Sequence, residues 1–94
     1  VEPIGYGLNE LLRLDPVSFT MKDRPHDGRR LGLVAQQVEG VVPEAVTPPA
    51  LPDEAYRLSY VELIPVLIKA IQEQQEQIEA LKGDLNTMRV IPGP

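Results

Sequence analysis

The chain has 94 residues, a formal net charge of −5 and no cysteine. This length allows one small domain, and the missing cysteines exclude disulfides and thiolate metal sites. The acidic balance argues against nucleic-acid binding, which depends on clustered Lys and Arg. Since no apolar run is long enough for a membrane span and no signal peptide is visible, we expect no membrane partner. We also expect no cofactor and no metal.

Local patterns in the first third predict a short helix followed by a β-hairpin. Leucines recur at helical spacing in residues 7–14, and Pro16 ends that helix. Residues 16–22 then alternate apolar and polar side chains, as in a half-buried strand. The turn formers of residues 23–28 separate this strand from residues 29–37, which resume an extended pattern.

The middle of the chain is less regular. Residues 35–46 are ambiguous between helix and strand, and Gly40 and Pro43 limit any helix there to a short one. Residues 47–54 contain three prolines, which predicts an exposed, stiff loop. Residues 55–60 are a candidate for a brief strand.

The last third predicts one long helix over residues 59–89. Ser59 and Glu62 have the spacing of a capping box at its start. Pro65 falls in the second predicted turn and is expected to kink it. Two prolines and a glycine in residues 90–94 end the helix.

A seven-residue repeat runs along this predicted helix. Its a positions are Ile64, Ile71, Ile78 and Leu85, its d positions are Leu67, Gln74, Leu81 and Met88, and Ile68 at e widens the apolar face. Seven of the eight a and d positions are apolar, which is typical of a coiled coil. The helix would be roughly 45 Å long, whereas the remaining 58 residues would form a domain about 25 Å across. We therefore predict that these nine side chains form an interface with other copies of the chain.

The number of copies stays open on the residues alone. Isoleucine at a with leucine at d favours two parallel helices. Gln74 supplies a polar layer that can fix the register, and Ile68 favours more than two helices.

Catalytic candidates are few. His26, the one histidine, lies in the predicted turn and is expected to be solvated. Ser18 and Lys22 lie on one strand face but about 13 Å apart at 3.3 Å per residue, too far for a Ser–Lys dyad. Ser59 is interpreted as a helix cap. We therefore expect no catalysis from this chain.

Three blocks resemble a known family. They read "GLNELLRLDPVSFTMKD", "RRLGLVAQQVEGVVPEAV" and "YRLSYVELIPVLIKAIQEQQEQIEAL", in that order. They are similar to the C-terminal intramolecular chaperone domain of phage endosialidase tailspikes, which also closes other tail fibres. The resemblance implies a homotrimer with parallel helices, which helps an upstream β-rich stalk of the same polypeptide to fold.

The resemblance also implies autoproteolysis, by a serine and a lysine in an S-D-x-x-x-K-like motif. By alignment of the blocks that motif would precede Val1, so we expect this chain to be a fragment that lacks it. We expect assembly in the host cytoplasm and a parent protein in a virion tail or on a bacterial surface. The expected fold is α+β, with a globular part at residues 1–58 and a trimeric coiled-coil helix and tail at residues 59–94.

Two other functions remain open on the sequence. The chain can be an oligomerisation or adaptor module whose coiled coil binds a heterologous partner. It can also derive from a self-cleaving Ser–Lys peptidase, an activity of the parent but not of this fragment.

Overall fold

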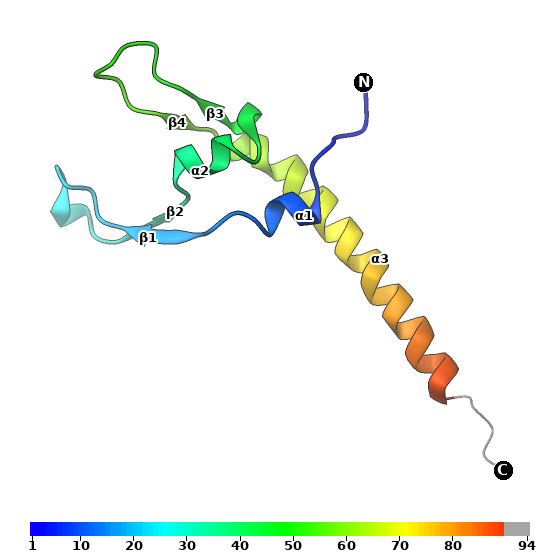
Figure 1. Ribbon diagram of the computed structural model, residues 1–94. Helices are drawn as coiled ribbons and strands as arrows, with labels where there is room; N and C mark the ends of the chain where they lie inside the picture. The colour runs from blue at the N-terminus through cyan, green and yellow to red at the C-terminus, as the bar shows by residue number, and fades with distance from the viewer. Residues whose placement is uncertain (90–94) are drawn as a thin grey trace.

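The computed structural model describes residues 1–89 and has an α+β fold, with two small β-ribbons and one long C-terminal helix (Figure 1). The helices are α1 (Leu8–Leu11), α2 (Ala35–Glu39) and α3 (Ile64–Arg89), and the strands are β1 (Val17–Phe19), β2 (Arg30–Gly32), β3 (Val46–Thr47) and β4 (Arg57–Leu58). The predicted helix-ending segment, residues 90–94, lies outside the described residues.

The predicted hairpin is confirmed. Strands β1 and β2 pair antiparallel, with Val17 opposite Gly32 and Phe19 opposite Arg30. Gly28 ends the connection with φ of 80°, a left-handed conformation that glycine adopts without steric cost. The extended pattern predicted to residue 37 is wrong beyond β2, because helix α2 begins at Ala35.

A second ribbon joins segments on either side of the proline loop. Val46 pairs with Leu58 and Thr47 with Arg57 in antiparallel register. The Ser59 amide extends this pairing by donating to the Ala45 carbonyl at 2.7 Å. The proline-rich loop is confirmed, whereas β3 is too short to leave a pattern in the sequence.

The long helical segment begins after Ser59, as predicted, but its first turn is not α-helical. Residues Tyr60–Leu63 form a 3₁₀ turn, and the α-helix begins at Ile64. Ser59 is the N-cap of that turn, but its side chain makes no capping hydrogen bond, so the predicted capping box with Glu62 is not formed. Pro65 explains the difference, because it has no amide to donate to residue 61. It lies in the first turn of α3, where such a donor is not needed.

A small core of valine, alanine and leucine side chains holds the globular part against the start of α3. Its members are Val38, Val41, Val42, Ala45, Val46, Leu63 and Val66, all at most 9% exposed. The core therefore includes residues on both sides of residue 58, where the globular part was predicted to end. At the edge of the core, the Tyr6 hydroxyl donates to Glu44 Oε1 at 2.7 Å, and this bond raises the pKa of Tyr6.

The chain is elongated, because most of α3 runs away from the globular part (Figure 1). Its extents are 73 × 38 × 17 Å and its radius of gyration is 19.8 Å, against about 12 Å for a compact domain of this length. Residues 74–89 continue for about 24 Å beyond Glu73, and those from 74 to 88 are all exposed.

We expect Val42→Ala to lower the free energy of unfolding by about 1.5–3 kcal/mol, since it removes two buried methyl groups from a site that is 1% exposed. Val34→Ala is the matched control. Val34, like Val42, is the N-cap residue of a short helical turn, but it is 39% exposed. Urea denaturation at fixed protein concentration measures both variants. Equal losses would contradict the placement of Val42 in the core.

Candidate functional site

The candidate site is an apolar face that follows α3 along its whole length. Its eight apolar members are 40% to 67% exposed in the single chain, and Gln74 between them is also exposed. They are Ile64, Leu67, Ile68, Ile71, Ile78, Leu81, Leu85 and Met88. With Gln74 they are the nine side chains predicted as an interface, and we call them the seam.

A different face of α3 packs against the globular part. Val66 and Ala70 of α3, together with Leu63 in the turn directly before it, are at most 4% exposed and follow the three- and four-residue spacing of one helix face. At 3.6 residues per turn, this face lies roughly a third of a turn from the seam. The domain therefore docks on α3 without covering the seam.

Helix α1 is fixed to α3 by a side-chain contact at the end of the docked face. Glu73 Oε1 accepts a hydrogen bond from the Leu8 amide at 3.0 Å, and Glu10 Oε1 accepts one from the Gly7 amide at 2.8 Å. A Cβ atom at position 7 would collide with the Glu73 carboxylate. Glycine at position 7 therefore allows Glu73 to reach the start of α1.

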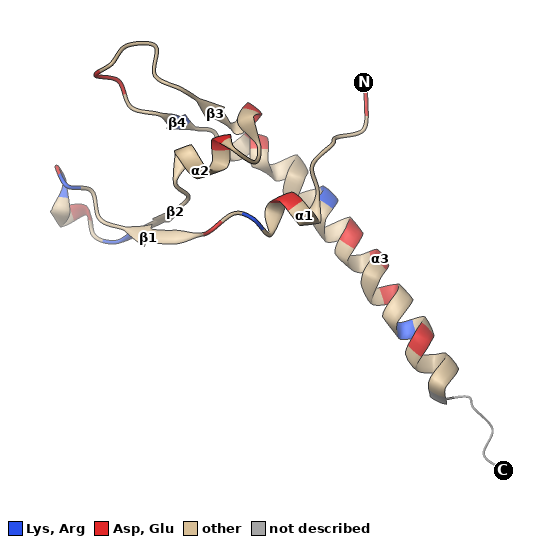
Figure 2. Cartoon of the chain, viewed as in Figure 1, with Lys and Arg blue, Asp and Glu red and all other residues tan. Residues whose placement is uncertain are grey.

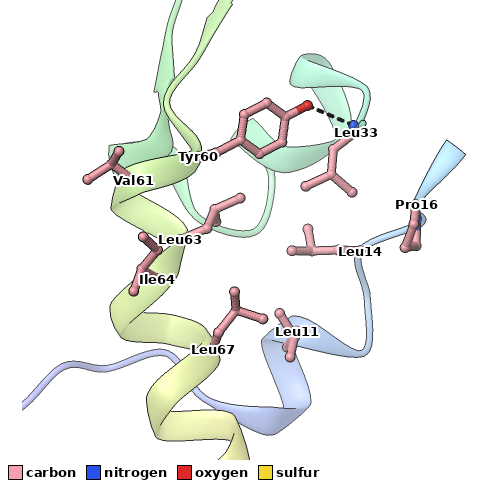
Figure 3. A pocket seen from close by; sticks show the side chains of 9 residues that line it. All are labelled: Leu11, Leu14, Pro16, Leu33, Tyr60, Val61, Leu63, Ile64 and Leu67. Carbon is pink, nitrogen blue, oxygen red and sulfur yellow. Dashed lines mark hydrogen bonds between the residues drawn. The ribbon is translucent and has the colours of Figure 1, made fainter. Parts of the chain in front are cut away.

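An apolar groove of about 510 Å³ opens between α3, the segment after α1 and the segment after β2 (Figure 3). It is lined by Leu11, Leu14, Pro16, Leu33, Tyr60, Val61, Leu63, Ile64 and Leu67. The Tyr60 hydroxyl accepts a hydrogen bond from the Leu33 amide at 3.1 Å, which holds the far wall of the groove to the start of α3. Since Ile64 and Leu67 belong to both surfaces, the groove is continuous with the seam.

The sequence alone does not reveal this groove. Leu11 and Leu14 have helical spacing, whereas Leu33 follows the extended pattern of β2, so the sequence indicates separate elements for them. No local sequence pattern connects these residues, because they are far apart in the chain and come together only after folding.

Charged residues are spread along α3 (Figure 2), and none of them occupies one of the nine seam positions. The ion pair between Lys82 and Glu79 spans 3.9 Å with both side chains more than 60% exposed, so it contributes little to stability. Gln75 donates to Glu79 at 2.7 Å on the same surface. No a or d position carries a charge, so nothing ionic has to be desolvated when the seam is covered.

The residues weighed as catalytic candidates lie apart in the fold. His26 is exposed in the 3₁₀ turn Pro25–Asp27, Ser18 lies within β1, and Ser59 precedes the turn before α3. Among residues 1–89, no group of three or more histidine, aspartate or glutamate side chains is placed to hold a metal ion. Within the same residues, no helix has both the length and the apolar character needed to cross a membrane.

Comparison with known proteins identifies the class. Residues 1–47, half of the chain, match the family described as chaperone of endosialidase, and the chain belongs to that family. A relative is the long tail fiber protein Gp37 of Enterobacteria phage M1, 38% identical over 69 residues. The match covers 72% of this chain and 28% of that relative, so the chain spans little more than a quarter of the tail fibre protein. No solved structure matches the chain.

These findings confirm the resemblance drawn from the sequence, including its connection to phage tail fibres. The matched region contains α1, the β1–β2 hairpin and α2, and it ends at the last residue of β3. Helix α3, with the seam, lies outside the family match.

We expect Gly7→Ala to lower the free energy of unfolding by about 1–2 kcal/mol. The added methyl group displaces the Glu73 carboxylate and breaks its charge-assisted bond to Leu8. Gly5→Ala is the control, because a Cβ there meets nothing within 4 Å. Chemical denaturation compares the two variants, and amide hydrogen exchange at Leu8 should accelerate only in Gly7→Ala. Unchanged exchange at Leu8 would argue against the bond.

Proposed function

We propose that this chain is a phage tail-associated intramolecular chaperone that forms a parallel homotrimer through the seam of α3. In this role it brings three copies of an upstream β-rich stalk of the same polypeptide into register, so that the stalk can fold. The observation that carries the proposal is the continuous, charge-free seam, which stays exposed while the domain packs on another face of α3.

The total surface supports assembly. The chain exposes 7846 Å², whereas a monomeric protein of 10.4 kDa exposes about 5,400 Å². The excess of about 2,400 Å² per chain is of the size that obligate oligomers cover. So much more exposed surface than in a compact monomer is typical of a subunit that is covered by other copies in an oligomer.

The length of α3 supports the same conclusion. Helices of about 15 residues are marginal in water when nothing packs against them, and residues 74–88 are exposed throughout. Packing of Ile78, Leu81 and Leu85 against other copies would supply the missing contacts. Burying one such side chain contributes about 1.5–3 kcal/mol before conformational entropy is subtracted.

The resemblance to trimeric chaperone domains and the exposed Ile68 support three copies over two. The exposed isoleucine at e widens the apolar face beyond the two-helix seam. Gln74 then forms a polar layer that can select one register among the helices.

The benefit to a stalk is kinetic. Strands contributed by three chains make mostly intermolecular contacts, which are slow to nucleate because ordering precedes any favourable contact. A terminal trimer makes that step effectively intramolecular by raising the local concentration of the chains. The proposal places assembly in the host cytoplasm and the finished parent protein in the virion tail.

Autoproteolytic release belongs to the proposal as a property of the parent polypeptide. We assign no catalytic role to residues 1–94, because Ser18 and Ser59 occupy a strand and a turn and the S-D-x-x-x-K-like motif is not among these residues. The chain is expected to act by association alone.

Molar mass in solution tests the proposal. We expect about 31 kDa by light scattering, three times the mass of one 10.4 kDa chain. Ile78→Asp should reduce the mass to that of a monomer, because it places three carboxylates together in the seam. Ala80→Asp, also on the exposed part of α3 but at position c, should leave the mass unchanged. A wild-type monomer at micromolar concentration would refute the trimer.

In the parent polypeptide, Ile78→Asp should also reduce the yield of soluble trimeric stalk, and Ala80→Asp should not. A normal stalk yield with a monomeric terminal domain would refute the chaperone role.

A further inference from the structure

We propose that the apolar groove beside α3 receives Ile68 of a neighbouring copy, so that each globular part grips the helix of the next chain. This inference rests on the proposed function and adds a second contact to the seam. It assigns the groove an occupant, a parallel copy of α3.

The chemistry of the groove favours an apolar side chain. Eight of its nine lining residues are aliphatic or proline, and the ninth is Tyr60. The Tyr60 hydroxyl is engaged by the Leu33 amide, which lies in the same wall. Small-molecule sites usually contain several convergent polar groups that orient the ligand. This groove offers one, already paired, so it suits an aliphatic side chain from another chain.

The position of the groove selects the occupant. In the heptad frame Leu63 precedes Ile64 at a and therefore occupies g, and it lines the groove. In a parallel coiled coil, g of one helix lies beside e of its neighbour. The e residue of the adjoining heptad is Ile68, which is 52% exposed. A neighbour seated on Ile64 and Leu67 thus directs Ile68 toward Leu63 and Leu14.

Ile68 does not serve its own groove. It is absent from the groove lining, and at 100° per residue it lies about 140° around the helix from Leu63. Each chain therefore presents a groove on one side of its seam and an isoleucine on the other. This arrangement closes in a ring with the same contact between each pair of chains, as cyclic symmetry requires.

Disulfide trapping tests the contact. The natural chain has no cysteine, so only the introduced cysteines can form a disulfide. One chain carries Leu14→Cys and a co-expressed, size-tagged chain carries Ile68→Cys, so that a bond between them gives a product of distinct size. Gln75→Cys replaces Ile68→Cys in the control. Position 75 is also an exposed e residue, but it lies about 10 Å further along α3, beyond disulfide reach of Leu14.

Under mild oxidation we expect at least about tenfold more product for the Leu14–Ile68 pair than for the Leu14–Gln75 pair. If light scattering shows a trimer but the two pairs give equal amounts of disulfide-linked product, or no such product, the groove contact is overturned and the trimer is not. A monomeric wild-type sample would overturn both proposals.

Polar substitutions in the groove, made without added cysteines, provide a second test. Leu14→Asn and Leu33→Asn should each raise the concentration at which the trimer dissociates by about tenfold or more, because they place an amide against an aliphatic partner. Leu12→Asn is the matched control, since Leu12 is 72% exposed and does not line the groove. Far-UV circular dichroism checks that each variant is folded. If folded groove variants dissociate at the same protein concentration as the natural chain, the contact is contradicted.

Discussion

The packing of one face of α3 against a valine-rich core determines how the rest of the chain is presented. Leu63, Val66 and Ala70 turn inward, and the three- and four-residue spacing of helical neighbours then directs the seam away from the domain. If the domain had docked on Ile64, Leu67 and Ile71 instead, the first half of the seam would be buried within one chain. The choice of docking face thus leaves the seam free for the proposed contact with other copies.

This separation is supported by polar contacts at the ends of the docked face. Tyr60 holds the segment after β2 at the start of α3, and Glu73 holds α1 two to three turns later. Both contacts use a side chain of the long helix or its first turn to satisfy a backbone amide of the globular part. They position Leu11, Leu14 and Leu33 around the groove, which the small core alone would not do.

Local signals explain what the sequence predicted. Helix α1, the β1–β2 hairpin, the proline loop and the long α3 all follow from residue periodicity and turn formers within a few positions. Helix α2 does not, because its residues fit a helix and a strand equally well. The sequence also predicts the apolar seam residues, because a heptad repeat can be recognised within one continuous segment. The family followed from three blocks whose order was already visible in the chain.

Long-range contacts explain what the sequence did not predict. The pairing of β3 with β4 joins two-residue strands across the proline loop, and such strands carry no periodicity. The Glu73–Leu8 contact joins residues 65 positions apart. The first turn before α3 was predicted as α-helix because Ser59 and Glu62 matched a capping pattern, whereas it is a 3₁₀ turn because Pro65 restricts where α-helical hydrogen bonding can begin.

In the proposed trimer, the stability of each chain would depend on association, because its core is small and residues 74–88 of its long helix are exposed in the single chain. The few buried side chains of the domain are mostly valine and alanine, so each contributes little apolar area. An interface that binds only the folded chain stabilises it by mass action, and the seam and groove are both formed by folded elements. Folding of each domain and pairing of its neighbours would then favour one another. In the proposed trimer, a module with this coupling would present three aligned N-termini only when all three domains have folded, and this is the condition under which the proposed upstream stalk could start in register.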